Sequence, residues 1–211
     1  MQFIDFQNKL SAYPIFSLKD VSKLIPVFNR IQLDRWEKKG YLKKVKRGFY
    51  CFSTQDFTQD FLFYTANKIY APSYAPSYVS LEMALKHYGL IPEEIFQITS
   101  VSTKKGTRFE TSLGHFSYRH IKPSLYFGYR LLDFGQQKLL IAEPEKAVLD
   151  YLYVNPKLKT ADDFLGMRIN ADQFRTHIDL EQFHQYLRVF DSKALSKRAE
   201  LFLNTIQHDQ S

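Results

Sequence analysis

The stretch RWEKKGYLKKVKRGFY, residues 35–50, gathers most of the positive charge of this chain. Seven of its sixteen residues are Lys or Arg and only Glu37 is acidic, so the stretch carries +6 of a formal net charge of +7. A solvated surface needs some charge, but it rarely holds nearly all of the excess in one place. This concentration indicates a surface that faces a polyanion.

The rest of the chain is electrically balanced. Residues 1–52 contain eleven Lys and Arg against four Asp and Glu, whereas residues 53–211 contain eighteen of each kind. The entire positive excess therefore belongs to the first quarter of the 211 residues. This asymmetry predicts a nucleic-acid-binding domain over residues 1–54, followed by a larger, neutral domain over residues 60–208.

Composition is that of a globular protein that can fill its own core, with 45% hydrophobic residues, nineteen Phe and fourteen Tyr. Cys51 is the single cysteine, which excludes an intramolecular disulfide and favours a reducing compartment. Residues 1–10 lack the basic start and apolar centre of a signal peptide. No apolar run approaches the roughly 18 residues that would suggest a membrane span. We therefore expect a cytoplasmic protein without a membrane partner.

The first thirty residues show two short helical patterns. Phe3, Phe6, Leu10 and Tyr13 recur at helical spacing before a proline ends the pattern. A second helix is expected to begin after Ser17, which resembles an N-cap with an acidic residue three positions on.

A third helix is predicted over residues 27–39, ending at Gly40. Two short β-like pieces follow, at residues 42–45 and 49–52, and the turn Lys46-Arg47-Gly48 between them predicts a tight hairpin. Three short helices followed by a two-stranded hairpin is the order of a winged helix-turn-helix.

In winged-helix proteins the third helix enters the major groove and the wing lies along the backbone. Arg side chains suit guanine, and Asn or Gln side chains suit adenine, so the expected base-reading residues are Asn29, Arg30, Gln32 and Arg35. The expected phosphate contacts of the wing are Lys43, Lys44, Lys46 and Arg47. Neutralising about five phosphates would give a slope of about −4.5 for log affinity against log salt. A solvated basic face, or a contact with RNA or an acidic protein, remains the alternative.

The second domain is expected to be α+β, with a mostly antiparallel sheet and flanking helices. Period-two patterns run from Phe96 to Ala142 in short pieces, including SLYFGYR at 124–130. The segment EPEKAVLDYLY, 143–153, predicts a helix with its proline in the first turn. Two more amphipathic helices are expected around 180–190 and 195–206, and the tandem repeat APSYAPSY, 71–78, is expected to form a turn.

A second group of basic residues lies in the strand-rich region and could extend a DNA footprint or contact a tRNA-like ligand. Its members are Lys104, Lys105, Arg108, Arg119 and Lys122. The alternative is that nearby acidic residues interrupt this group, because the domain as a whole carries no net charge.

Four segments together resemble the AbiEi family of type IV antitoxins. They are LDRWEKKGYLKKVKRGFYCF (33–52), PSYVSLEMALKHYGL (76–90), GHFSYRHIKPSLYFGY (114–129) and LIAEPEKAVLDYLY (140–153). The resemblance covers most of residues 15–155 in the same order, and EPEKAVLDYLY and RGFY are its more specific parts.

This resemblance implies an N-terminal winged helix and a C-terminal α+β antitoxin domain. Such proteins bind repeats in the promoter of their own operon, repress it, and counter a nucleotidyltransferase-like toxin without forming a stable complex. The DNA-binding role carries over to Arg30, Arg35, Lys43, Lys44, Lys46 and Arg47. The antitoxin role has no comparable residue signature, and a regulator without a toxin would have a similar sequence.

Catalytic and metal motifs are weak in this chain. A nucleotidyltransferase needs a Gly-Ser turn and an Asp-x-Asp pair, but the sequence has no Gly-Ser dipeptide and Asp162 and Asp163 are adjacent. EPEK lacks the Glu-x-Lys spacing of metal-dependent nucleases, and no His pair has convincing metal-ligand spacing. We expect no enzyme activity, metal or cofactor. The alternatives are a nucleic-acid-processing enzyme, which metal-dependent activity would favour, and an RNA- or protein-binding adaptor, which indifference to DNA sequence would favour.

Overall fold

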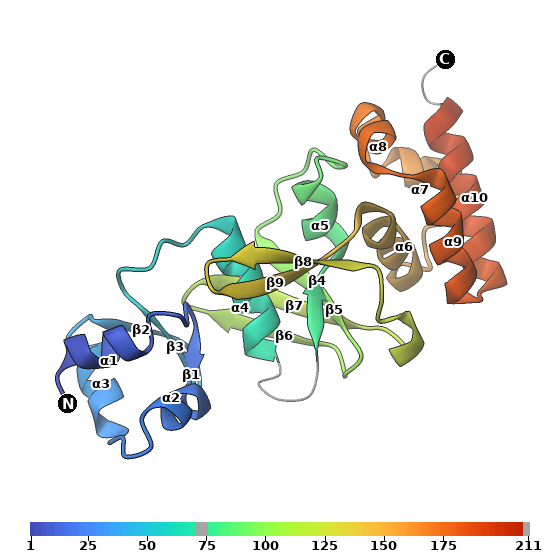
Figure 1. The fold of residues 1–211 in the computed structure, drawn as a ribbon. Helices are drawn as coiled ribbons and strands as arrows, with labels where there is room; N and C mark the ends of the chain where they lie inside the picture. The colour runs from blue at the N-terminus through green and yellow to red at the C-terminus, as the bar shows by residue number, and fades with distance from the viewer. Residues whose placement is uncertain (71–75, 209–211) are drawn as a thin grey trace.

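The computed structural model describes residues 1–70 and 76–208 of the chain (Figure 1). The strands form two separate sheets, and helices flank them, so the predicted α+β class is confirmed. Within the described residues, no helix is both long and apolar enough to cross a membrane.

Residues 1–54, here called the N-terminal unit, contain the three helices and the hairpin that the sequence predicts. A short unpredicted strand, β1, pairs antiparallel with β3 and completes a three-stranded sheet in the order β1-β3-β2. The elements are α1 (Phe3–Lys9), β1 (Phe16–Ser17), α2 (Leu18–Leu24), α3 (Ile31–Lys38), β2 (Leu42–Lys46) and β3 (Phe49–Phe52). The winged helix-turn-helix itself remains a prediction.

The capping box predicted for the second helix is confirmed. The Ser17 hydroxyl accepts a hydrogen bond from the Asp20 backbone N–H at 3.2 Å, and the Asp20 carboxylate accepts one from the Ser17 backbone N–H at 2.8 Å. These two bonds satisfy amide groups that the first turn of a helix leaves without partners.

Residues 60–208, here called the body, are built on a six-stranded sheet in the order β6-β7-β5-β4-β9-β8. Its first helix, α4 (Gln59–Tyr70), starts one residue before this range. Its strands and the elements between them are β4 (Ser77–Val79), α5 (Leu81–His87), β5 (Gln97–Ser102), β6 (Thr107–Thr111), β7 (Gly114–His120), the 3₁₀ turn η1 (Pro123–Leu125), β8 (Tyr129–Phe134) and β9 (Gln137–Ala142).

This sheet is more mixed than the sequence predicts. Three neighbouring strand pairs are antiparallel, but β5–β7 and β4–β9 are parallel. The β4–β9 pair arises because the end of the 71–78 repeat, which predicts a turn, forms β4 and inserts between β5 and β9. The β5–β7 pair arises because β6 lies at the sheet edge, so that β7 pairs with β5 on its other side. Residues 71–75 of that repeat lie outside the described residues. The strand predicted at 124–130 is also misplaced, since η1 occupies its start and β8 begins at Tyr129.

Five helices follow the sheet: α6 (Pro144–Val154), α7 (Ala161–Leu165), α8 (Ala171–His177), α9 (Leu180–Phe190) and α10 (Lys193–His208). The helix predicted from EPEKAVLDYLY is α6, and the two predicted tail helices are α9 and α10. Neither α7 nor α8 is predicted from the sequence. With five and seven residues, these two are too short for a clear helical period.

The sheet of the N-terminal unit is covered on both faces. Along β3, Tyr50 and Phe52 pack with the helices of the N-terminal unit, whereas Phe49 and Cys51 belong to the hydrophobic core of the body. This alternation follows the two-residue period of a strand. The hairpin therefore joins the two parts of the molecule and is not an isolated projection.

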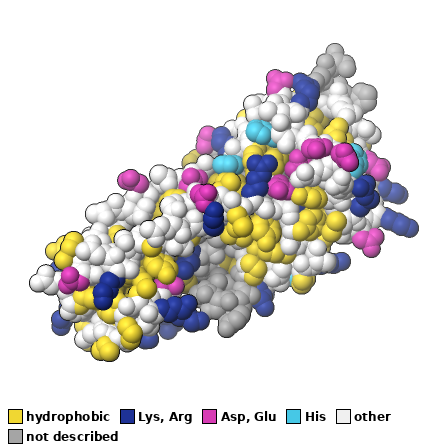
Figure 2. Space-filling model, in the orientation of Figure 1, with side chains coloured by type: hydrophobic (Ala, Val, Ile, Leu, Met, Phe, Trp, Pro, Cys, Tyr) yellow, Lys and Arg dark blue, Asp and Glu magenta, His cyan; other side chains and the backbone are white. Residues whose placement is uncertain are grey.

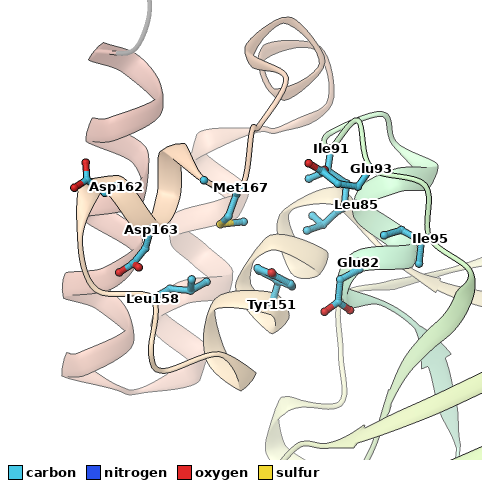
Figure 3. Close-up of a pocket in the computed structure, with 11 residues that line it drawn as sticks. Glu82, Leu85, Ile91, Glu93, Ile95, Tyr151, Leu158, Asp162, Asp163 and Met167 are labelled. Carbon is cyan, nitrogen blue, oxygen red and sulfur yellow. The ribbon is translucent and has the colours of Figure 1, made fainter.

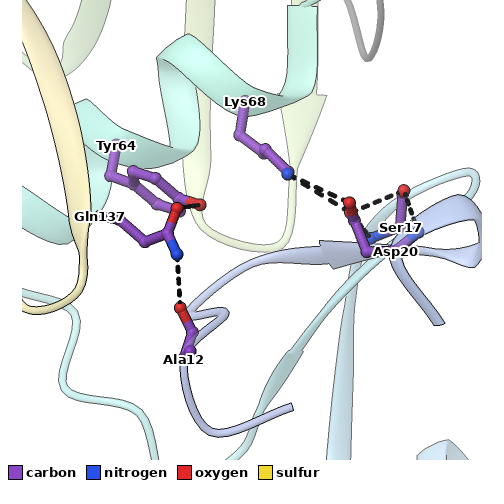
Figure 4. Close-up of polar contacts among 6 residues, drawn as sticks. All are labelled: Ala12, Ser17, Asp20, Tyr64, Lys68 and Gln137. Carbon is purple, nitrogen blue, oxygen red and sulfur yellow. Dashed lines mark hydrogen bonds and ion pairs between the residues drawn. The ribbon is translucent and has the colours of Figure 1, made fainter. Parts of the chain in front are cut away.

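Polar contacts also tie the N-terminal unit to the body (Figure 4). The Gln137 side chain donates a hydrogen bond to the Ala12 carbonyl at 2.9 Å. Lys68 on α4 forms an ion pair with Asp20 at 3.4 Å, so the carboxylate that caps α2 also contacts the body. These contacts fix the orientation of the basic surface relative to the larger domain.

Candidate nucleic-acid interface

The helix expected to read bases is shorter than predicted. Because α3 begins at Ile31, Asn29 and Arg30 precede it. The Asn29 side-chain oxygen accepts a hydrogen bond from the Ile31 backbone N–H at 3.0 Å. This bond stabilises the start of the helix and occupies the oxygen. Arg30 and Arg35 are exposed, and Gln32 is half-buried. The helix start and its outward side thus present two arginines to solvent.

The exposed face of α3 contains residues that the sequence prediction passed over. Ile31, Asp34, Arg35 and Lys38 are all exposed, at the i, i+3, i+4, i+7 spacing of a single helix face. Leu33 and Trp36 are buried on the opposite side. Just before the helix, Val27 is 97% exposed. Helical spacing alone would predict this exposed face. The predicted helix start at residue 27 lies four residues before the observed start, so the prediction missed it.

Two of the four predicted wing cations are exposed. Lys44 and Arg47 are exposed to solvent, and the Lys43 ammonium lies 4.7 Å from the centre of the Phe57 ring. The hairpin turn itself consists of Arg47 and Gly48, with Gly48 at φ +83°, a conformation that glycine adopts readily. In the view of Figure 2, Lys and Arg side chains lie along the lower edge of this end of the molecule, and others lie at the opposite end.

Lys46 does not take the predicted place. Its ammonium donates a hydrogen bond to the Ile69 carbonyl at 2.8 Å and lies 3.6 Å from the centre of the Phe109 ring. Burial lowers the pKa of this side chain. Since the last carbonyls of a helix are left without intrahelical partners, Lys46 caps the C-terminal end of α4. It points into the contact between hairpin and body and not toward an outside phosphate.

The second predicted basic group divides into two. Lys104, Lys105 and Lys122 are exposed near one edge of the sheet, where the parallel strands β5 and β7 end. Arg108 and Arg119 instead line a cavity of about 310 Å³ that also includes Glu82 and Glu94. The Arg119 guanidinium donates a hydrogen bond to the Val154 carbonyl at 3.1 Å. The single basic patch therefore remains a prediction, and two of its members share a cavity with carboxylates.

A buried polar cluster, missed in the sequence, lies where α6 packs on β4. The Lys146 ammonium contacts the Asp150 carboxylate and donates a hydrogen bond to the Tyr78 hydroxyl at 2.8 Å. The other carboxylate oxygen accepts hydrogen bonds from Tyr78 and Ser80, both at 2.9 Å. Burial lowers the pKa of Lys146, while Asp150 acts in the opposite direction.

The acidic residues that precede this cluster connect α6 to another helix. The Glu145 carboxylate accepts a hydrogen bond from the Asp179 backbone N–H at 2.8 Å, and Glu143 accepts hydrogen bonds from Tyr186 and Gln182 on α9. All four charged residues of the EPEKAVLDYLY segment thus bind other parts of the body. Neither Lys146 nor Asp150 has any exposed side-chain surface, so no ligand reaches them in this arrangement.

Titratable residues do not otherwise converge on a metal-binding arrangement. Across residues 1–70 and 76–208, no three His, Cys, Asp or Glu side chains come together in a way that could hold a metal ion. Cys51 is a buried free thiol that donates a weak hydrogen bond to the Lys43 carbonyl.

Comparison with known proteins adds no further assignment. No protein-family model matches the chain, and no curated protein matches its sequence. The resemblance to AbiEi antitoxins therefore depends on the four sequence segments alone.

Proposed function

We propose that this protein is a sequence-specific double-stranded DNA-binding regulator whose N-terminal unit acts as a winged helix-turn-helix. The observation that carries the proposal is the outward side of α3 beside the hairpin. Arg30, Arg35 and Lys38 are exposed at the helix, and Lys44 and Arg47 are exposed on the hairpin. All five are cations in the part of the chain that holds the whole positive excess.

In this proposal α3 lies in the major groove and the hairpin contacts the backbone. Arg30 and Arg35 would donate paired hydrogen bonds to guanine, and Asp34 could accept one from the amino group of cytosine. The exposed apolar side chains of Val27 and Ile31 suit contact with thymine methyl groups. Lys43, Lys44 and Arg47 would neutralise phosphates, which positions the protein without reading the sequence.

A finer part of the proposal rests on the family resemblance. The protein would repress its own operon and counter a nucleotidyltransferase-like toxin without forming a stable complex with it. Co-expression with the toxin encoded beside its gene tests this part. Growth restored both by the protein and by a variant that no longer binds DNA would assign the antitoxin role to the body. Failure to restore growth would mean that the protein acts only as a regulator.

The DNA-binding part is tested by titrating the protein against its own upstream region and a scrambled duplex of equal length. Each neutralised phosphate contributes about −0.9 to the salt slope, so K43A/K44A/R47A is expected to flatten the slope by about 2.7. The matched control K157A/K159A/K197A removes the same charge from exposed positions of the body and should leave the slope unchanged. Equal, weak binding to both duplexes, unaffected by the first variant, would refute the proposal.

A further inference from the structure

A groove with an apolar bottom lies among α5, α6 and α7, which are remote from the basic hairpin in Figure 1, and Figure 3 shows the residues that line it. It has a volume of about 520 Å³ and lies between α5 with its following loop and the segment from α6 to α7. Its apolar lining includes Leu85, Ile91, Leu158 and Met167. Leu85, Ile91 and Met167 are 1%, 8% and 9% exposed, so they form the closed bottom of the groove. A hollow with an apolar bottom can receive an apolar side chain of a partner.

The rim of this groove is acidic. Glu82, Glu93, Asp162 and Asp163 line it, and among the described residues no Lys or Arg does. Burial raises the pKa of the Tyr151 hydroxyl, and the negative charges of Glu82 and Glu93 add to this effect. Glu82 and Glu93 therefore both place negative charge near the Tyr151 hydroxyl, from the α5 side of the groove.

These carboxylates are only partly neutralised within the molecule. Asp163 is occupied in capping α7, where it accepts hydrogen bonds from Lys159 and Thr160. Arg168 approaches Glu93 at 3.8 Å, but its side chain is 71% exposed. Over the described part of the chain, the carboxylates of Glu82 and Asp162 have no ion-pair partner. Negative charge therefore remains available to a cation from outside.

Exposed apolar side chains extend the surface beyond the groove. Phe96 is 88% exposed, and Leu165 on α7 is 41% exposed. Phe96 lines the neighbouring 310 Å³ cavity, which shares Glu82 and Ile95 with the groove. The neighbouring cavity has a mixed lining that includes Arg108 and Arg119, so only Ile95 and Phe96 extend the apolar surface toward it. Two adjoining hollows suit a chain segment better than a single small ligand. Exposed aromatic residues are typical of protein interfaces.

We propose that this groove binds a basic segment of a protein partner, in which aliphatic or aromatic side chains are flanked by Lys or Arg. The apolar bottom receives the aliphatic or aromatic groups, and Glu82, Glu93 and Asp162 attract the flanking cations. The same carboxylates repel phosphate, which disfavours nucleic acid as the occupant of the groove. The two ends of the molecule would then bind partners of opposite charge, independently of whether the N-terminal unit reads DNA.

A synthetic peptide pair tests the proposal with the full chain. One labelled helical peptide carries leucines along one face and lysines beside them, and its twin has glutamate in place of lysine. Fluorescence anisotropy should show saturable binding of the lysine peptide, weakened about fivefold in E82Q/E93Q. L158A should also weaken binding, through the loss of apolar contact. The control E110Q/E181Q removes two exposed carboxylates outside the groove and should bind as the unchanged protein does.

Several outcomes would overturn the proposal. They are no binding of the lysine peptide, equal weakening by the groove and control variants, or equal binding of the glutamate peptide. A self-association in size-exclusion chromatography that E82Q/E93Q abolishes would assign the groove to a second copy of the chain instead. Circular dichroism of each variant distinguishes lost binding from lost folding.

Discussion

Lys146 and Asp150 lie one turn apart on α6 and form an ion pair whose two side chains have no exposed surface. The pair is not isolated, because Tyr78 and Ser80 from β4 and its end supply hydrogen bonds to the same carboxylate. Desolvating two charges is unfavourable, and only such a complete set of partners compensates for it. The pair therefore fixes where α6 packs on the central sheet, and it explains why a charged segment lies in the core.

Removing one partner of this pair should be far more damaging than removing both. D150A leaves an uncompensated ammonium in the core, and we expect a loss of about 3–5 kcal/mol in the free energy of unfolding. The double variant K146M/D150L replaces the pair with apolar groups of similar size and should lose much less. Urea denaturation measures both. If D150A unfolded within about 1 kcal/mol of the unchanged protein, the pair would have no such role.

Gly128 should tolerate no side chain, because it combines a positive φ with a close approach to this pair. Its φ is +67°, and a Cβ atom there would lie 3.0 Å from Cγ of Lys146 and 3.0 Å from Cε2 of Tyr186. Lys146 is held by its ion pair and cannot easily move aside. We expect G128A to destabilise the protein by about 2–4 kcal/mol, from backbone strain and overpacking together.

Gly135 provides the matched control for that substitution. Its φ is +60°, and no atom lies within 4 Å of the position that an alanine Cβ would take. G135A should therefore show only the backbone strain of about 1 kcal/mol. Thermal or urea unfolding that gave equal losses for the two variants would mean that the contact with Lys146 is unimportant.

Cys51 should be unreactive in the folded protein. Burial raises the pKa of its thiol to about 11, so the thiolate that reacts with alkylating reagents is scarce at pH 8. We expect iodoacetamide to modify Cys51 only after unfolding in urea, which mass spectrometry detects. Because the folded pKa lies above the reference value of 9.0, this group stabilises the fold below about pH 9 and loses that contribution between about pH 9 and 11. Fast labelling of the folded protein at pH 8 would contradict the buried position.

Local sequence patterns predict much of the fold, but they do not predict contacts between segments that lie far apart in the sequence. The Ser17 cap, the hairpin and the helix after Pro144 follow from spacing and turn chemistry alone. The parallel strand β4 and the burial of Lys146 depend on packing between segments about 70 residues apart, which no local period reports. Lys46 points inward because of a β-bulge between Lys44 and Lys46, and the sequence pattern does not reveal that bulge. The bulge places Lys46 opposite Phe49, whose side chain faces the body.

That bulge leads to a prediction that separates Lys46 from Lys44 of the same strand. Lys46 caps α4 and contacts the Phe109 ring, so K46A should reduce the free energy of unfolding by about 1–2 kcal/mol and leave the salt slope of DNA binding unchanged. Lys44 is exposed, so K44A should leave stability unchanged and flatten that slope by about 0.9. Urea denaturation and DNA titration at several salt concentrations measure the two quantities for each variant. A flatter slope for K46A with unchanged stability would show that this lysine faces the phosphate backbone after all, and that the hairpin leaves the body when it binds DNA.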